Sequence, residues 1–420
     1  MNSWLLQQAE DVTSDRNPEQ DRIPVAPDLE SVLSAVRVPH SEPVISTRVV
    51  YIAGLAVVIG LSAGAIATIL TALIGAITNL FFYGRFATTL VSPAGGHVGF
   101  WVLLIPVLGG IVVGLLARFG SAAIRGHGIP EVMENVLQSG SRIPARVLFL
   151  KPISAAIAIG TGGPFGAEGP IIATGGALGS LIGQWIRITA DERKTLLAAG
   201  AAAGMAATFG SPVSAVLLAV ELLLFEYRAR SIIPVALATC AATGVRIAIH
   251  GTRPAFVIPT LAQPSGSALA SYLVLGLIIG VAAVLISRAV YWIEDVFDHL
   301  PIHWMWWPAL GAFAVGVIGF FEPRTLGIGY EYIEQIASGQ ILGVALIVFI
   351  ALKFLSWSIY LGSGTSGGTL APLFMIGGGL GAALGEIAGR LAPGLGVSVT
   401  AAAVVGMAAM FAGASHALLA

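Results

Sequence analysis

The chain has 420 residues, of which 56% are hydrophobic and 10% are charged, and its formal net charge at pH 7 is −1. With a mean hydropathy of +0.89 it carries too little polar surface for a soluble protein of this length, so composition indicates an all-α integral membrane protein. The apolar segments are too long for the strands of a membrane β-barrel. We expect no enzyme activity, cofactor, metal or nucleic-acid partner, and the single cysteine, Cys240, excludes an internal disulfide.

The first segment, residues 1–47, is polar and contains scattered prolines and acidic residues. It lacks a basic start followed by an apolar core and a small-residue cleavage site, so we interpret it as a cytosolic tail and not as a signal peptide. The apolar runs at 49–77 and 269–286 approach or exceed the roughly 20 residues that a spanning helix needs. We therefore expect the membrane part to begin near residue 48.

Three glycine-rich breaks interrupt the apolar segments: "GHGIPE" at 126–131, "GAEGP" at 166–170 and "GTLAP" at 368–372. We expect a helix after each break. Irregular backbone at membrane depth is tolerated only where protein buries it or where it lines a cavity. Helix N-termini carry free N–H groups and a partial positive charge, so three converging starts would bind an anion without a basic side chain. The alternative, glycines that serve only close helix packing, is disfavoured because Gly-Pro breaks interrupt helical hydrogen bonds.

The chain also repeats itself at a fixed offset. Residues 160–183 align with residues 362–385, so the offset is 362 − 160 = 202. The same offset relates "GMAATF" at 204–209 to "GMAAMF" at 406–411. One offset that holds over much of the chain indicates a duplication.

The duplication predicts a domain organisation: a first membrane repeat at 48–250 and a second at 251–420. Residue 420 pairs with Leu218, so we expect the second repeat to be incomplete at its C-terminal end. Duplicated bundles with broken helices are typical of transporters whose substrate site lies between the repeats. An odd number of crossings in each half would make the two repeats inverted.

The three breaks and the segment at 196–221, "LLAAGAAAGMAATFGSPVSAVLLAVE", together resemble the CLC family of chloride channels and chloride/proton exchangers. The resemblance runs from about residue 50 to the C-terminus, with the motifs in the family's order. It implies two inverted-topology repeats of tilted and broken helices, and a homodimer with one ion pathway in each subunit. It further implies transport of chloride or a similar small inorganic anion, with or without coupled protons, across the cell (inner) membrane.

Carried over by motif, Glu168 corresponds to the family's external gating glutamate. An ionisable side chain inside the membrane costs roughly 2.5–3.5 kcal/mol on insertion scales and indicates a function. At a helix N-terminus its carboxylate can occupy the place of an anion, and protonation would release it. The alternative is a capping carboxylate without a gating role. The resemblance assigns further residues to anion binding: His127, Gly128, Ile129, Gly166, Ala167, Gly169, Thr369 and Leu370.

Two departures from the family bear on the transport mode. His127 stands where the family often has serine, which leaves the preferred anion open, and its imidazole either faces the pathway or turns away from it. Glu221 is a candidate for a proton path, but exchangers usually have a second glutamate next to it, and here that residue is Leu222. Leu222 slightly favours a channel; the alternative is an exchanger whose protons take another inner route.

Lys151 and Lys353 are also counterparts at the offset of 202, and both lie in apolar runs. Either they raise the potential along the anion path or they extend to the membrane interface. We interpret a cluster of tryptophans, Trp304, Trp306 and Trp307, as an interfacial aromatic belt.

A second function class comes from "GTSGG" at 364–368, which contains Gly-x-Ser-Gly, and from His416 in a later apolar segment. This pair resembles the serine/histidine dyad of rhomboid intramembrane proteases, with Ser366 as the nucleophile. The duplication argues against it, because Ser366 pairs with Pro164 and the loop is therefore shared architecture.

Overall fold

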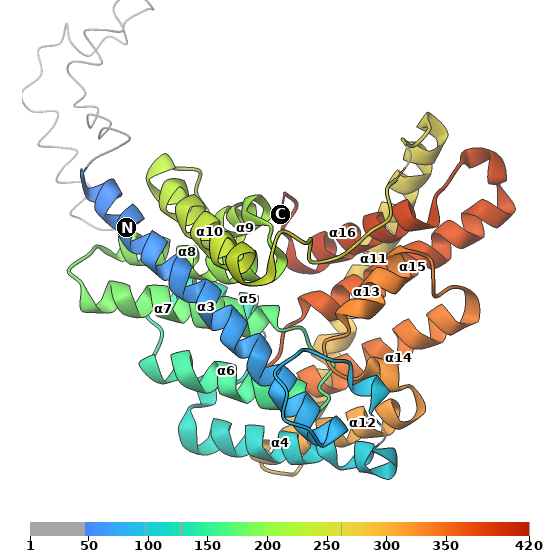
Figure 1. Cartoon of the computed structure of the whole chain (residues 1–420), viewed down its shortest axis with the longest axis horizontal. Coiled ribbons are helices and arrows are strands. Elements are labelled where there is room, and N and C mark those ends of the chain that lie inside the picture. Colours follow the sequence, from blue (N-terminus) through green and yellow to red (C-terminus); the bar gives the residue numbers. More distant parts are fainter. Residues whose placement is uncertain (1–46, 97, 127, 262, 420) are drawn as a thin grey trace, which may run out of the picture. The chain divides into compact units, whose positions relative to one another are not determined.

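The computed structural model describes residues 47–419 of the chain, apart from 97, 127 and 262. These residues are helical without a β-strand, and from Arg48 onward they form one compact unit. With the labels of Figure 1, the α-helices are α3 (Thr47–Tyr83), α4 (Ile105–Leu115), α5 (Ile129–Gln138), α6 (Ala145–Gly160), α7 (Glu168–Trp185), α8 (Ala190–Phe209), α9 (Pro212–Ala219), α10 (Ala229–His250), α11 (Gly266–Asp298), α12 (Trp307–Phe321), α13 (Tyr330–Ala337), α14 (Gly343–Gly362), α15 (Leu370–Leu391) and α16 (Val399–Ser415).

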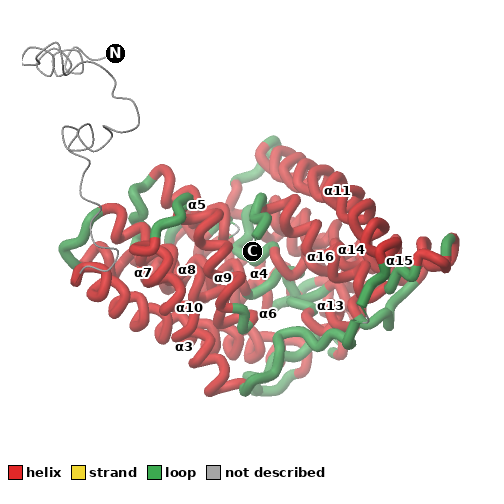
Figure 2. The backbone as a smooth tube through the Cα atoms, turned by 90° about the horizontal axis from the view of Figure 1, so that it is seen from above, coloured by secondary structure: helices red, strands yellow, loops and turns green. Residues whose placement is uncertain are grey.

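Short helical turns complete the secondary structure. The 3₁₀ turns are η2 (Pro93–Gly95), η3 (Gly99–Leu103), η5 (Ala122–Ile124), η7 (Trp304–Trp306), η8 (Pro323–Thr325) and η9 (Pro393–Leu395), and the π-helical turns are η4 (Leu116–Gly120) and η6 (Val220–Leu224). Figure 2 shows irregular segments running between the helices through the middle of the molecule.

In the described part of the chain, seven helical segments are long and apolar enough to cross a membrane. They are Thr47–Tyr83, Gly99–Gly120, Ala229–His250, Gly266–Asp298, Trp304–Phe321, Gly343–Gly362 and Leu370–Leu391. The predicted spans at 49–77 and 269–286 are thus confirmed as parts of α3 and α11. The chain is an integral membrane protein.

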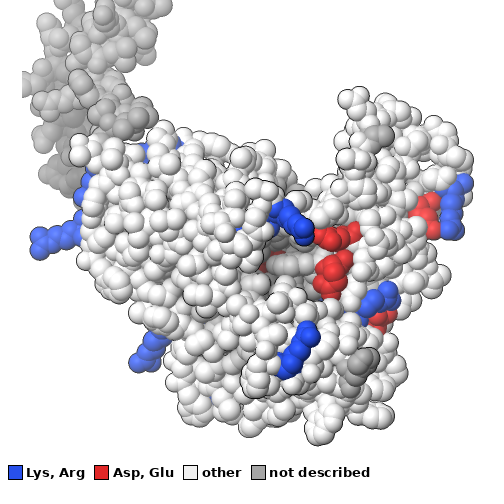
Figure 3. All heavy atoms as spheres, viewed as in Figure 1, with Lys and Arg blue, Asp and Glu red and all other residues white. Residues whose placement is uncertain are grey.

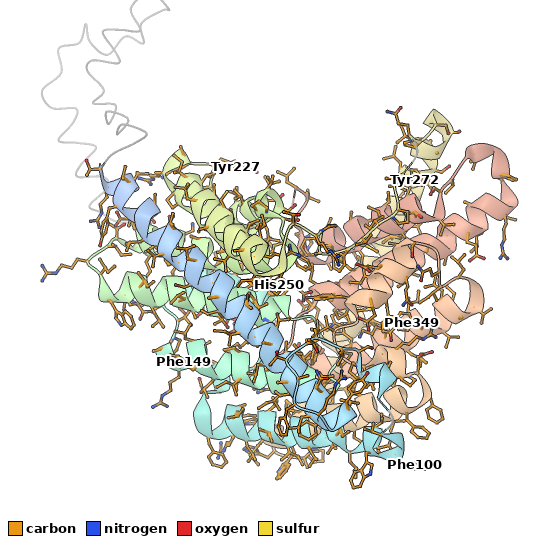
Figure 4. The ribbon with its side chains drawn as sticks, in the orientation of Figure 1. Phe100, Phe149, Tyr227, His250, Tyr272 and Phe349 are labelled. Atoms are coloured by element: carbon orange, nitrogen blue, oxygen red, sulfur yellow. The ribbon has the colours of Figure 1, made fainter. Side chains whose placement is uncertain are left out.

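The outer surface suits a lipid environment. Figure 3 shows a face that is largely free of charge, with the charged residues gathered at a central hollow and at a few points of the rim. Large apolar side chains point outward, such as Phe100, which is 76% exposed, and Phe149, which is 66% exposed (Figure 4). In water such a surface would be costly, whereas in hydrocarbon it needs no cover.

Helices in the two halves of the sequence correspond at the offset of 202. α4 and α12 begin at Ile105 and Trp307, and α7 and α15 begin at Glu168 and Leu370. In Figure 1, α5 to α8 and α13 to α16 form two groups, and α4 and α12 run along the same edge of the molecule. Gly110 of α4 packs against the backbone of α12, where an added methyl group would lie 2.5 Å from the carbonyl oxygen of Pro308.

The most buried helices lie inside these groups. α7 packs on α8, and Gly175 lies against the backbone carbonyl of Gly200 so closely that either residue with a side chain would collide with it. Gly377 of α15 and Gly406 of α16 form the same kind of contact. Small residues let helix backbones approach in a membrane, where close packing replaces the hydrophobic effect. These tightly packed pairs hold the starts of α7 and α15 at the centre of the molecule.

Candidate anion-binding site

Each of the three glycine-rich breaks leads directly into a helix. α5 begins at Ile129, α7 at Glu168 and α15 at Leu370. The helices thus begin before the end of each motif, slightly earlier than predicted. A proline fits there because the N–H groups of the first turn have no partner within the helix. Glu168 therefore belongs to the first turn of α7 and not to the loop.

The three helix starts converge, as predicted. A methyl group at Gly128 would lie 2.5 Å from the Cα of Gly169, and one at Gly169 would lie 2.8 Å from the Cα of Gly368. No side chain fits at such distances, so these three backbones touch only because all three residues are glycines. The partial positive charges of three N-termini consequently meet in one place.

A pair of hydrogen bonds joins the breaks before α7 and α15. The N–H of Gly166 donates to the carbonyl of Gly368 over 3.1 Å, and the N–H of Gly368 donates to the carbonyl of Gly166 over 3.0 Å. Together they form an isolated antiparallel bridge. Since 368 − 166 = 202, each glycine is the counterpart of the other in the duplication. Equivalent residues of the two halves therefore pair with each other at the centre of the site.

The carboxylate of Glu168 lies over this bridge. The residue is 1% exposed. A Cβ on Gly368 would lie 2.9 Å from its Oε2, and a Cβ on Gly166 would overlap the carboxylate. Among the described residues, Oε2 has no hydrogen-bond partner. A carboxylate at converging helix N-termini has the position and the charge of a bound inorganic anion.

The other carboxylate oxygen has a partner that sequence reasoning missed. The hydroxyl of Tyr330, the first residue of α13, donates to Oε1 of Glu168 over 2.9 Å. A signal for it exists in the sequence, since "GIGYEY" at 327–332 aligns, with a small slip, with "GHGIPE" at 126–131. The helix start within "GIGYEY" therefore approaches the same centre as the start of α5.

Lys151 and Lys353 hold the loops that lead to α5 and α13. Both side chains are buried, so they do not extend to the membrane interface. The ammonium group of Lys151 pairs with Glu131 and donates to the carbonyl of Gly126. The ammonium group of Lys353 donates to the carbonyls of Thr325 and Gly327, over 2.8 and 3.0 Å. Each cation thus satisfies the polar backbone of a break.

The other described residues that are predicted to bind the anion lie at the three helix starts. Ala167 and Leu370 are buried, and His127 lies outside the described residues. Thr369 borders a cavity of about 100 Å³, lined also by Pro130, Ser287, Tyr291, Trp357 and Leu373. This cavity reaches the starts of α5 and α15.

Glu221 lies in η6, away from these helix starts in the sequence. Its carboxylate accepts hydrogen bonds from the backbone N–H groups of Leu418 and Leu419, over 3.0 to 3.1 Å. The neighbouring Leu222 is buried in the apolar core. The described contacts of Glu221 are therefore structural ones that tie η6 to the segment after α16.

The structure does not support the protease alternative. Ser366 is 1% exposed, and its hydroxyl has no hydrogen-bond partner among the described residues. His416 is exposed and caps the C-terminal end of α16. A serine nucleophile requires a base within hydrogen-bond reach, which His416 does not provide.

The tryptophans expected at the interface have specific contacts. The guanidinium of Arg125 lies 5.0 Å from the ring centroid of Trp304 and 5.6 Å from that of Trp307. Trp307 is buried and donates from its indole nitrogen to the carbonyl of Ile302 over 3.1 Å. Trp306 is 45% exposed, so it alone of the three presents a large apolar surface outward.

Comparisons with known proteins agree with this architecture. Residues 108–420 match the family model described as voltage gated chloride channel. The chain is 33% identical over 338 residues to chloride channel protein CLC-f of Arabidopsis thaliana, a match that covers 74% of this chain and 42% of that protein. It is 31% identical over 333 residues to the H(+)/Cl(-) exchange transporter ClcA of Vibrio campbellii, covering 77% of this chain and 71% of the relative.

Solved structures share the fold. A slow cyanobacterial Cl⁻/H⁺ antiporter superposes with a TM-score of 0.76 at 24% identity, covering 86% of this chain and 85% of the other. A CLC-type fluoride/proton antiporter superposes with a TM-score of 0.72 at 22% identity, covering 87% of both chains. The all-helical fold with broken helices is thereby confirmed.

Proposed function

Because the chain belongs to the voltage-gated chloride channel family, we propose that it carries chloride or a similar small inorganic anion across a membrane through a path gated by Glu168. One observation carries the proposal: the buried carboxylate of Glu168 lies where the starts of α7 and α15 meet, at the helix N-termini that we propose bind the anion. The same helix starts that hold the carboxylate would hold the transported anion once the carboxylate leaves.

Protonation is the step that would release the gate. A neutral carboxyl loses the attraction of the helix N-termini, so an anion can replace it. When the proton leaves, the restored charge draws the side chain back over the Gly166–Gly368 bridge. Anion flux is therefore expected to rise as the pH falls.

The same site supports coupling of the anion to protons. Each release of Glu168 consumes one proton, so a cycle that delivers protons to one side and anions to the other gives exchange. The ClcA relatives and both antiporter structures are named for such exchange. The sequence-based preference for a channel, drawn from Leu222, is not confirmed by these names, and we favour proton-coupled exchange over it. Glu221 remains the candidate for an inner proton path.

The wider assembly belongs to the same proposal. We propose a homodimer in a cell (inner) membrane and two inverted repeats, 48–250 and 251–420, preceded by a cytosolic tail at 1–47. The correspondence of α4 with α12 and of α7 with α15 supports the repeats. Gly128, Ile129, Gly166, Ala167, Gly169, Thr369 and Leu370 are proposed to surround the anion, with His127 as the residue that tunes which anion is preferred.

Reconstitution of the full chain in liposomes tests the gate. We expect Glu168→Gln to leave anion efflux present and to remove its dependence on pH, because a neutral amide has no proton to lose. Glu134→Gln, which alters an exposed carboxylate on α5, is the matched control and should keep the pH dependence. Unchanged pH dependence in Glu168→Gln would overturn the gating role.

The transport mode requires a second measurement, the reversal potential under a proton gradient with symmetric chloride. Exchange predicts a nonzero reversal potential in the unmodified protein and a value of zero in Glu168→Gln. A value of zero in both proteins would identify a channel.

A further inference from the structure

The hydrogen bond from Tyr330 to Glu168 gives the gate a second component. We propose that Tyr330 is a positioning residue that latches the ionised Glu168 carboxylate in its docked place and so sets the pH at which the anion path opens. This inference rests on the proposed gating role of Glu168. It adds a residue from the second half of the chain, 162 positions away in sequence, to a gate carried by the first half.

The geometry fixes the direction of this bond. A tyrosine hydroxyl can donate to an ionised carboxylate, which can only accept. The bond of 2.9 Å therefore stabilises the charged form of Glu168, and bonds to charged acceptors are stronger than neutral ones. The Tyr330 ring is itself held, since it packs edge-on to Phe256 with the centroids 5.7 Å apart. The hydroxyl is thus aimed at the docked carboxylate by the packing of α13.

A latch must also open, and the surroundings of Tyr330 allow it. The residue borders a cavity of about 70 Å³ whose lining includes Thr78, Ser92, Gly329 and Glu331. Such a volume holds water, and polar groups in the lining can bind it. Once Glu168 leaves, the hydroxyl can bond to water in place of the carboxylate. Opening therefore does not leave a buried donor unsatisfied, which would be costly.

Among the described residues, the charged side chains near Glu168 form no hydrogen bond to its carboxylate, and Oε1 of Glu331 has no hydrogen-bond partner at all. Lys151 of α6 pairs with Glu131 of α5, and Lys353 of α14 binds two loop carbonyls. Glu331 of α13 borders the cavity. The charged residues of α8 lie in its first turns and those of α15 in its last turns: Asp191, Glu192, Arg193, Lys194, Glu386 and Arg390. Among the described residues, Tyr330 is the titratable side chain whose hydrogen bond reaches the Glu168 carboxylate.

The test is the pH profile of anion efflux from liposomes that contain the full-length Tyr330→Phe protein. Removing the hydroxyl weakens the docked, charged state by about tenfold or more, as expected for a hydrogen bond to a charged group. A tenfold change corresponds to about one pH unit. We expect the midpoint of the profile to move upward by about one unit and efflux at neutral pH to increase. A merely structural defect would lower efflux at every pH without moving the midpoint.

Two comparisons make the result specific. Tyr332→Phe removes a hydroxyl from the same short helix, but one that bonds to Ser92 over 3.2 Å, and should leave the midpoint in place. In a Glu168→Gln background, Tyr330→Phe should have no further effect on the profile. An unchanged midpoint in Tyr330→Phe, with pH dependence still lost in Glu168→Gln, would overturn the latch and leave the gate intact. Persistent pH dependence in Glu168→Gln would overturn both.

Discussion

The break before α7 and the break before α15 have the same backbone arrangement but differ in the side chain that begins the helix. Both place a glycine in the central bridge and start a helix immediately afterwards. The first residue of the helix is Glu168 in one half and Leu370 in the other. The shared backbone arrangement directs two helix N-termini at one place, but only the α7 side contributes an acidic side chain there. We propose that the shared helix N-termini attract the anion and that Glu168 controls access to it.

The loops before α5 and α13 differ in a related way. Lys151 is neutralised by Glu131, whereas Lys353 binds two backbone carbonyls and, among the described residues, forms no salt bridge. A buried cation therefore has a carboxylate in contact in the first half but not in the second. The two lysines differ in their side-chain partners and not in the type of backbone around them. Substitution of these side chains can therefore remove the difference between the two halves.

The largest effect on transport is expected from making the two halves alike. Leu370→Glu would place a second carboxylate at the start of α15, opposite Glu168, where it competes with the anion. We expect anion efflux at neutral pH to fall at least about tenfold, which is about 1.4 kcal/mol. Leu370→Gln has a similar shape without the charge and serves as the control. Equal efflux for the two variants would show that the start of α15 does not border the anion path.

A large effect on stability is expected from the paired lysine. Lys151→Met leaves Glu131 without its cation, and breaking a mostly buried ion pair costs about 3 kcal/mol. Lys353→Met leaves two carbonyls unpaired at about 1–3 kcal/mol, so its thermal unfolding temperature in detergent should fall less. Adding Glu131→Gln to Lys151→Met should restore part of the loss. An equal loss in the two lysine variants would contradict the difference between the halves.

The smallest effect concerns the starts of α8 and α16. Thr189 and Glu192 form a reciprocal capping box on α8, whereas on α16 the Ser398 hydroxyl accepts one bond of 3.4 Å. We expect Thr189→Ala to destabilise the protein by about 1 kcal/mol and Ser398→Ala by less. Thermal unfolding of the two purified variants in detergent measures the difference, and the reverse order would contradict the assignment.

The sequence predicted the site to the extent that backbone chemistry determines it. Glycine and proline at 166–170 and 368–372 indicate where one helix ends and the next begins. The offset of 202 indicates that the two breaks are equivalent positions of the duplication. The convergence of the three helix starts was predicted from such patterns, whereas the contacts among Gly128, Gly169 and Gly368 were not. The helix starts came slightly earlier than predicted, because a proline is tolerated throughout the first turn.

What the sequence did not predict depends on contacts between distant side chains. The Tyr330–Glu168 bond spans 162 residues, and no local pattern specifies which side chain a helix start brings to its neighbour. The burial of Lys151 and Lys353 could not be predicted from the sequence either. A lysine in an apolar run looks the same whether it extends to the interface or binds carbonyls inside the protein. Only the positions of the loop carbonyls that the lysines bind, such as those of Gly126 and Gly327, distinguish the two.

The bridge between Gly166 and Gly368 has a mechanical consequence. Moving the two central loops apart requires two backbone hydrogen bonds to break together, and their residues have no side chains that could take over the contact. Sliding one half past the other at this point is therefore resisted, whereas rotation of one glutamate side chain disturbs neither bond. If Glu168 is the gate, as we propose, the path can open by movement of this one side chain while the two halves stay joined at the bridge.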